Sequence, residues 1–222
     1  MAIRSGSSSM ANGNAAQQPC AAAPAIALWL QSTRPVGRVA ELGSLVADRA
    51  RSLQMATNLP VTIRRAELAD TPAIADIYNE AILTTTATFD IEPKSVEERT
   101  QWLQSHDERH PVLVAVVDGR VVGWASLTRW SERRAYDDTA ETSFYVLSTH
   151  RGRGIGRKLK DAIIEEARRL RYHTLIARVA EGSRESIHLN ESAGFVHVGT
   201  LKEVGRKFGR LLGVHIMQKM LD

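Results

Sequence analysis

The feature that most constrains this chain is a glycine-rich segment placed between a predicted strand and a predicted helix. A β-rich run ends near Val146, and after the segment apolar residues recur at helical spacing from Ile155 onward. Glycine has no Cβ atom, so the backbone can curl there and direct successive N–H groups at an anion at the helix N-terminus. Arginines add charge-assisted hydrogen bonds to phosphate, and we therefore predict a diphosphate site. The segment consists of Arg151, Gly152, Arg153, Gly154, Ile155, Gly156 and Arg157.

Other glycine-rich motifs do not fit this segment. The Gly-Lys-Ser/Thr ending of a Walker loop is absent. The glycines alternate instead of following the dinucleotide-binding spacing, and no acidic residue closes a second strand. A turn with solvated arginines is the alternative interpretation, because a short glycine motif alone is weak evidence for phosphate binding.

The chain after residue 60 alternates between strand and helix patterns. Strands are predicted at residues 61–65, 111–117, 120–127, 141–146, 174–179 and 214–220, with Asp118-Gly119 as a hairpin turn. Helices are predicted after a cap at Asp70 or Thr71 with Pro72 in the first turn, after the Ser95–Glu98 capping box, from 154 to 170, and from 184 to 193 ahead of Gly194. This order predicts a mixed α/β fold and not a bundle or a barrel.

Residues 1–58 differ in composition from the remainder. They are rich in Ala, Ser, Gly, Gln and Asn, and such a segment buries too little apolar surface to offset chain entropy. We expect a low-complexity, disordered extension with one weak amphipathic helix at residues 36–55. An organelle transit peptide and a wrongly chosen upstream start codon both fit it, and we favour the second. A compact domain is expected at residues 61–222, and Met55 is a natural starting point.

Charge, cysteine and histidine patterns narrow the function. The pI is near 9.5, yet residues 1–60 hold five arginines against two acidic residues, and the rest holds 24 basic and 23 acidic side chains. We therefore predict no nucleic-acid partner. Cys20 is the only cysteine, which excludes an internal disulfide and a cysteine zinc site. No apolar run is long enough to span a bilayer, and the seven histidines lack metal-ligand spacing. We expect no metal, no membrane and a cytoplasmic location.

Several motifs in a fixed order carry a family resemblance. The segment from Arg151 fits Q/R-x-x-G-x-G/A after a strand, which resembles the acetyl-CoA signature of the GNAT superfamily of N-acetyltransferases. Further motifs resemble its phosphinothricin and methionine sulfoximine N-acetyltransferase branch. These are Tyr78-Asn79, residues 85–89, 111–115, 139–146 and 203–210. The resemblance covers residues 62–222 and implies a GNAT (acyl-CoA N-acyltransferase) fold, α/β, with a mixed, mostly antiparallel sheet whose central strands are splayed and flanked by helices.

The resemblance implies how the co-substrate acetyl-CoA is held. Backbone groups of Phe144, Tyr145 and Val146 would bind the pantetheine arm, and residues 151–157 would hold the pyrophosphate. The N–H of Val146 would stabilise negative charge on the thioester oxygen. Ser183 and Ser192 occupy cofactor-binding positions where the branch has Asn and a basic residue.

The resemblance also implies an amine pocket and a general base. An α-amino group is largely protonated near neutral pH, so acetyl transfer needs a base, and Glu141 matches the family's glutamate. The ordinary interpretation of such a residue is a solvated strand carboxylate. Arg133 would pair with an acidic group of the substrate. The substrate-binding residues expected on this basis are Ser131, Glu132, Arg133, Glu141, Thr142 and Ser143.

The chain departs from the family where a proton donor is expected. The superfamily usually has Tyr and this branch His where this chain has Asn190. A carboxamide donates a hydrogen bond but has no suitable pKa for protonating a leaving thiolate. Water or direct thiolate release must substitute, or the rate falls. Further departures are Ser131, Leu211 and Gly213, where the branch has Arg, Trp and Asp.

Together these features predict an enzyme that moves acetyl from acetyl-CoA to the amino group of a small amino-acid-like substrate. Phosphinothricin, methionine sulfoximine and methionine sulfone are the expected types, and the resemblance implies a homodimer. Two alternatives stay open. One is an acetyltransferase for another amine, such as a protein N-terminus or a polyamine, and the other is a non-catalytic acyl-CoA-binding module.

Overall fold

The computed structural model of this protein describes residues 60–221. The predicted extension at residues 1–58 and the weak helix at residues 36–55 lie outside the described residues, so both stay predictions.

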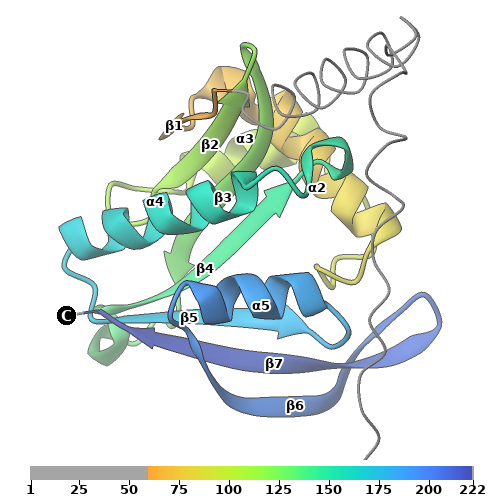
Figure 1. Cartoon of the computed structure of the whole chain (residues 1–222), viewed down its shortest axis with the longest axis vertical. Coiled ribbons are helices and arrows are strands. Elements are labelled where there is room, and N and C mark those ends of the chain that lie inside the picture. Colours follow the sequence, from red (N-terminus) through yellow and green to blue (C-terminus); the bar gives the residue numbers. More distant parts are fainter. Residues whose placement is uncertain (1–59, 222) are drawn as a thin grey trace, which may run out of the picture. The chain divides into compact units, whose positions relative to one another are not determined.

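Seven strands form one mixed sheet in the order β1-β2-β3-β4-β5-β7-β6 (Figure 1). Every neighbouring pair is antiparallel except β4 and β5, which run parallel. The strands are β1 (Thr62–Arg65), β2 (Val112–Val117), β3 (Arg120–Arg129), β4 (Thr139–Val146), β5 (Thr174–Ala180), β6 (Val196–Lys207) and β7 (Arg210–Met220). The predicted mixed, mostly antiparallel sheet is confirmed.

Helices cover both faces of the sheet. Figure 1 shows α4 and α5 in front of it and α2 and α3 behind it. On the front, Leu159 and Ile163 of α4 join Leu127 of β3 in one buried cluster; on the back, Ile77 of α2 packs with Trp124. The helices are α2 (Thr71–Thr84), α3 (Val96–Gln104), α4 (Ile155–Arg169) and α5 (Arg184–Ser192), with 3-10 turns η1 (Leu68–Asp70), η2 (Arg134–Tyr136) and η3 (Ser148–His150).

Local signals place the helix ends and one turn. The predicted capping box at α3 is confirmed, because Ser95 Oγ accepts from Glu98 N at 3.1 Å and Glu98 Oε2 accepts from Ser95 N at 2.7 Å. Asp70 is at the N-cap position of α2, but its carboxylate does not cap the helix; it accepts from the Arg64 guanidinium at 2.6 and 2.9 Å instead. Asp118-Gly119 turns the β2–β3 hairpin as predicted.

β6 is the strand that the sequence pattern did not predict, and β7 begins at Arg210 and not at residue 214. β6 is exposed along nearly its whole length, so it has no alternation of buried and exposed residues. Its pairing with β7 also shifts register at His197/Gly199 and Leu201/Gly205. Such irregularities move side chains between faces and hide the period-2 signal.

β4 and β5 separate partway along their length. They pair only over residues 139–141 of β4 and 174–176 of β5. Beyond that point β4 continues to Val146 against β3, and β5 continues to Ala180 against β7. The splayed central strands implied by the resemblance are therefore confirmed.

The separation leaves backbone groups of β4 without a strand partner. Leu147 N donates to Val122 O at 3.0 Å, continuing the antiparallel β3–β4 register. Antiparallel pairs alternate between bonded and non-bonded, so the backbone groups of Thr142, Phe144 and Val146 are directed away from β3, toward the open edge. The groups of Tyr145 are directed at β3.

Candidate active site

The glycine-rich segment forms a loop that ends at the N-terminus of α4. Gly152 and Gly154 have φ of 73° and 75°, the left-handed region that favours glycine, and Gly154 is the N-cap of α4. No heavy atom lies within 4 Å of where a Cβ would stand at either glycine, so the space beside the loop is open. The first bond within the helix is from Lys158 N to Gly154 O at 3.1 Å. The preceding N–H groups of the first turn therefore remain available to an anion.

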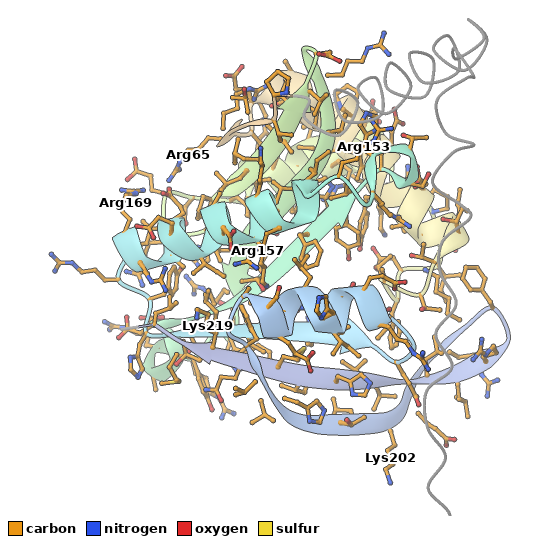
Figure 2. All side chains as sticks on the ribbon, in the orientation of Figure 1. Arg65, Arg153, Arg157, Arg169, Lys202 and Lys219 are labelled. Atoms are coloured by element: carbon orange, nitrogen blue, oxygen red, sulfur yellow. The ribbon has the colours of Figure 1, made fainter. Side chains whose placement is uncertain are left out.

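The three arginines of the loop have different surroundings. Arg151 Nε donates to Val146 O at 3.1 Å, which holds the loop against the end of β4. Arg157 Nε donates to both carboxylate oxygens of Asp161 at 2.8 and 2.7 Å. Arg157 Nη1 also donates to Ser192 Oγ at 3.3 Å, which joins α4 to the last turn of α5. Arg153 is exposed at the loop (Figure 2) and is the arginine best placed to meet a ligand from solvent.

A pocket lies where β4 and β5 separate, next to α5. Its lining includes Thr142, Ser143, Phe144 and Tyr145 from β4, Arg178 from β5, and Ser183 and Asn190 from the segment of α5. The structure therefore brings together five of the residues predicted for cofactor or substrate. Ser192 lies outside this lining and reaches the arginine loop through Arg157.

Glu141 is not among the residues that line this pocket. Side chains alternate along a strand, and the buried Ala140 and Thr142 on either side of it face α4. Glu141 lies on the other face, where its Oε1 accepts from Arg178 Nε at 2.7 Å. Its side chain is only 12% exposed. Because Arg178 also lines the pocket, the carboxylate is one residue removed from the cleft.

The predicted substrate loop lies at the other end of β4. It connects β3 to the start of β4, and Arg129 pairs with Ala140 at that end. Ser131 Oγ accepts from Arg133 N at 3.3 Å, and Glu132 accepts from Arg129 Nη1 at 3.3 Å. Arg133 and Glu132 are both exposed. Within the described chain, none of these loop residues lines the pocket.

An aromatic cluster supports the back of β4. The Tyr145 ring packs against Tyr78 and Trp124 with centroids 5.1 and 4.8 Å apart. Burial raises the pKa of the Tyr145 phenol. The guanidinium carbon of Arg99 stands 3.6 Å from the ring centre of Trp102, and burial lowers the pKa of Arg99 to about 10. The sequence analysis did not identify Arg99.

Two buried polar side chains stand on the front of the cleft. Asn190 is 1% exposed; its Nδ2 donates to Ser186 O at 2.8 Å, and its buried Oδ1 has no hydrogen-bond partner in the described structure. Lys160 is fully buried, and its Nζ donates to Thr142 Oγ1 at 2.8 Å. The sequence analysis missed Lys160. Its position three residues before Ile163 and four before Ile164, on the apolar stripe of α4, was the signal that could have identified it.

A glycine-rich loop suited to a diphosphate, next to a cleft with an open strand edge, is the arrangement expected of an acyl-CoA-dependent N-acetyltransferase. The model of the Acetyltransferase (GNAT) family matches residues 74–195, and the chain belongs to this family. It is an acetyl-CoA-dependent N-acetyltransferase. Two curated relatives are similar over most of their length. L-methionine sulfoximine/L-methionine sulfone acetyltransferase of Salmonella typhimurium is 39% identical over 163 residues, covering 73% of this chain and 95% of the relative. Phosphinothricin N-acetyltransferase of Streptomyces coelicolor is 36% identical, covering 68% and 90%.

Solved structures are similar in both sequence and fold. yncA from Salmonella typhimurium, solved with its cofactor acetyl-CoA, is 39% identical with a TM-score of 0.71, covering 73% of this chain and 94% of that one. Ribosomal-protein-alanine N-acetyltransferase from Brucella melitensis is 45% identical with a TM-score of 0.71, covering 72% and 99%.

The described residues fit acetyl-CoA as co-substrate. The open glycine loop and the N-terminus of α4 suit a pyrophosphate, and the open edge of β4 suits an extended arm with amide groups. Among residues 60–221, no cluster of three metal-ligating side chains occurs. Over the same residues, none of the helices has the length and apolarity to cross a bilayer.

Proposed function

We propose that the protein transfers acetyl from acetyl-CoA to the amino group of a small amino acid that carries a second acidic or polar group, of the phosphinothricin, methionine sulfoximine or methionine sulfone type. The observation that carries this proposal is the separation of β4 from β5 directly beside the glycine loop. The names of the curated relatives support the substrate class.

The cleft suggests roles for the predicted cofactor residues except the backbone of Tyr145, whose groups are directed at β3. The arginine loop, residues 151–157, would bind the pyrophosphate through backbone N–H groups and Arg153. Backbone groups of Phe144 and Val146 on the open edge would bind the pantetheine arm, and Val146 N–H would stabilise the thioester oxygen. Ser183 lines the pocket, and Ser192 accepts a hydrogen bond from Arg157; both would contribute to the cofactor side of the site. The co-substrate supplies the activated acetyl group.

Glu141 is the proposed general base. The amine and the thioester would meet where β4 and β5 separate. Glu141 lies at that point, since it forms the last β4–β5 pair with Ile176. Its carboxylate contacts Arg178, which lines the cleft, and it would take the amine proton directly or through one water. Ser131, Glu132, Arg133, Thr142 and Ser143 stay proposed substrate contacts, with Arg133 as partner of the substrate's acidic group.

A second candidate substrate is a protein N-terminus, because one similar structure is named a ribosomal-protein-alanine N-acetyltransferase. Release of CoA thiol would be measured with methionine sulfoximine, methionine sulfone, phosphinothricin, an alanine-initiated peptide and a polyamine. Turnover of the free amino acids alone supports the proposal. Turnover of the peptide alone favours the second candidate, and turnover of none of these amines contradicts both candidates.

We also propose a homodimer and a cytoplasmic location. β6 exposes a row of apolar side chains, including Val196, Val198 and Leu201 at 64%, 57% and 50% exposure. An exposed, apolar edge strand favours pairing with another chain. Light scattering of the wild type and of Val198→Lys tests this: a dimer that becomes monomeric supports it, and a wild-type monomer contradicts it. The single cysteine in the whole chain is consistent with a reducing compartment.

A further inference from the structure

Lys160 is a buried amine beside the cleft that the proposed mechanism does not use. It projects from the stripe of α4 that faces the sheet and has no exposed surface. Its Nζ donates to Thr142 Oγ1 at 2.8 Å and lies 4.0 Å from the ring centre of Phe195 and 5.6 Å from that of Phe144. Burial lowers the pKa of Lys160 to about 7, so both protonation states are accessible near neutral pH.

Thr142 connects this amine to the pocket. Thr142 is one of the residues that line the pocket, and its hydroxyl accepts from Lys160, which leaves the hydroxyl's own proton to donate. The acceptor within the described structure is Ile176 O at 3.4 Å, a long and weak contact. The hydroxyl can therefore turn its proton to a stronger acceptor in the cleft without losing a good hydrogen bond.

No opposite charge stabilises Lys160 among the described residues that surround it. The carboxylates on the neighbouring elements are engaged elsewhere: Asp161 of α4 binds Arg157, and Glu141 of β4 binds Arg178 of β5. Toward the pocket, α5 contributes the uncharged amide of Asn190. Burial is accordingly the cause of the lowered pKa. A buried ammonium without a counter-ion destabilises the fold, so structure alone gives no reason for a lysine at this place.

We propose that Lys160, acting through the Thr142 hydroxyl, supplies the proton that the leaving thiolate of CoA needs. This rests on the proposed acetyl transfer. As the carbon–sulfur bond breaks, its electron pair stays on sulfur. The Thr142 hydroxyl gives its proton to that sulfur and takes one from the Lys160 ammonium. Lys160 is left neutral and regains a proton from solvent when the products leave. Asn190, which has no transferable proton of suitable pKa, does not take part.

The first test measures a bound ligand, without turnover. The thiol pKa of CoA bound to the wild type, followed by the ultraviolet absorbance of the thiolate, is compared with that in Lys160→Met and Thr142→Val. A hydrogen bond to the thiolate favours it, and the Thr142 hydroxyl that would donate this bond is itself held by Lys160, so each substitution should raise the thiol pKa by roughly one unit. Lys158→Met, which removes an exposed lysine from the same helix, should leave it unchanged. An unaltered thiol pKa in both variants overturns the proposal, whether or not the protein acetylates the tested amines.

The second test uses kinetics with the amine that the wild type acetylates best. Lys160→Met and Thr142→Val should each lower kcat about tenfold or more, and the double variant should be no worse than either, because both interrupt one path. Calorimetric affinity for acetyl-CoA should not change. Asn190→Tyr, which places a phenol at the pocket, should restore kcat in the Lys160→Met background. Additive losses, or an unchanged kcat and pH profile in Lys160→Met, would mean that Lys160 only packs.

Discussion

Replacing Lys160 with methionine should stabilise the fold, and the gain should shrink as the pH rises. Methionine keeps a long, flexible side chain in the space between Thr142 and Phe195 and removes the buried amine. The pKa of Lys160 is about 7 in the folded protein, against an ordinary value of 10.5. Each unit of difference is worth about 1.4 kcal/mol, so burying the ammonium costs on the order of 5 kcal/mol at pH 6.

The pH dependence has a definite sign. Below pH 7 the amine is protonated in both states, and the full cost is present. Between pH 7 and 10.5 the unfolded chain holds a proton that the folded chain has released, so wild-type stability rises with pH relative to the variant. From pH 6 to pH 9.5 the advantage of Lys160→Met should fall by about 3 kcal/mol. The lost hydrogen bond reduces it by about 1 kcal/mol at every pH, and the lost cation–π contact with Phe195 reduces it by up to about 1 kcal/mol only where the amine is protonated.

Urea unfolding of the wild type, Lys160→Met and Lys158→Met at pH 6, 8 and 9.5 measures this difference. Groups common to all three chains cancel in the comparison. Lys158→Met should follow the wild type at each pH, because Lys158 is exposed. A difference between the wild type and Lys160→Met that stays constant from pH 6 to pH 9.5 would refute the buried-amine reasoning.

Three further predictions concern the cleft and the extension. Glu141→Gln should lower kcat/KM roughly a hundredfold or more, with the greatest loss at low pH and an unchanged affinity for acetyl-CoA. A full rate across pH 6 to 9 would mean that another residue is the general base. Gly154→Glu should abolish CoA binding in calorimetry, since it puts a carboxylate at the anion site, on a residue with left-handed backbone conformation. Unchanged affinity in a folded variant would mean that the loop does not bind CoA. A chain that begins at Met55 should fold and bind CoA like the full chain, and circular dichroism with calorimetry would expose a loss of either.

Features that depend on local backbone chemistry can be predicted from the amino-acid sequence alone. Glycines between a strand and an amphipathic helix specify the loop at the start of α4, because few other residues adopt the left-handed conformation found at Gly152 and Gly154. Asp118-Gly119 likewise determines the β2–β3 hairpin, and Ser95 with Glu98 determines the start of α3. The glycine-rich segment between a strand and a helix also indicated the GNAT family, and the match of the family model confirmed it.

Features that depend on partners distant in the chain become visible only in the folded molecule. β6 carries no buried face of its own, so its pairing with β7 is invisible in its pattern. Glu141 and Arg178 meet because β4 and β5 stay paired up to Ile176 and separate beyond it. The position of Lys160 on the apolar stripe of α4 suggests burial, but only the folded structure shows that Thr142 and Phe195 surround its amine. The environment of a side chain is set by residues far away along the chain, and a single amine changes its pKa when they remove its water.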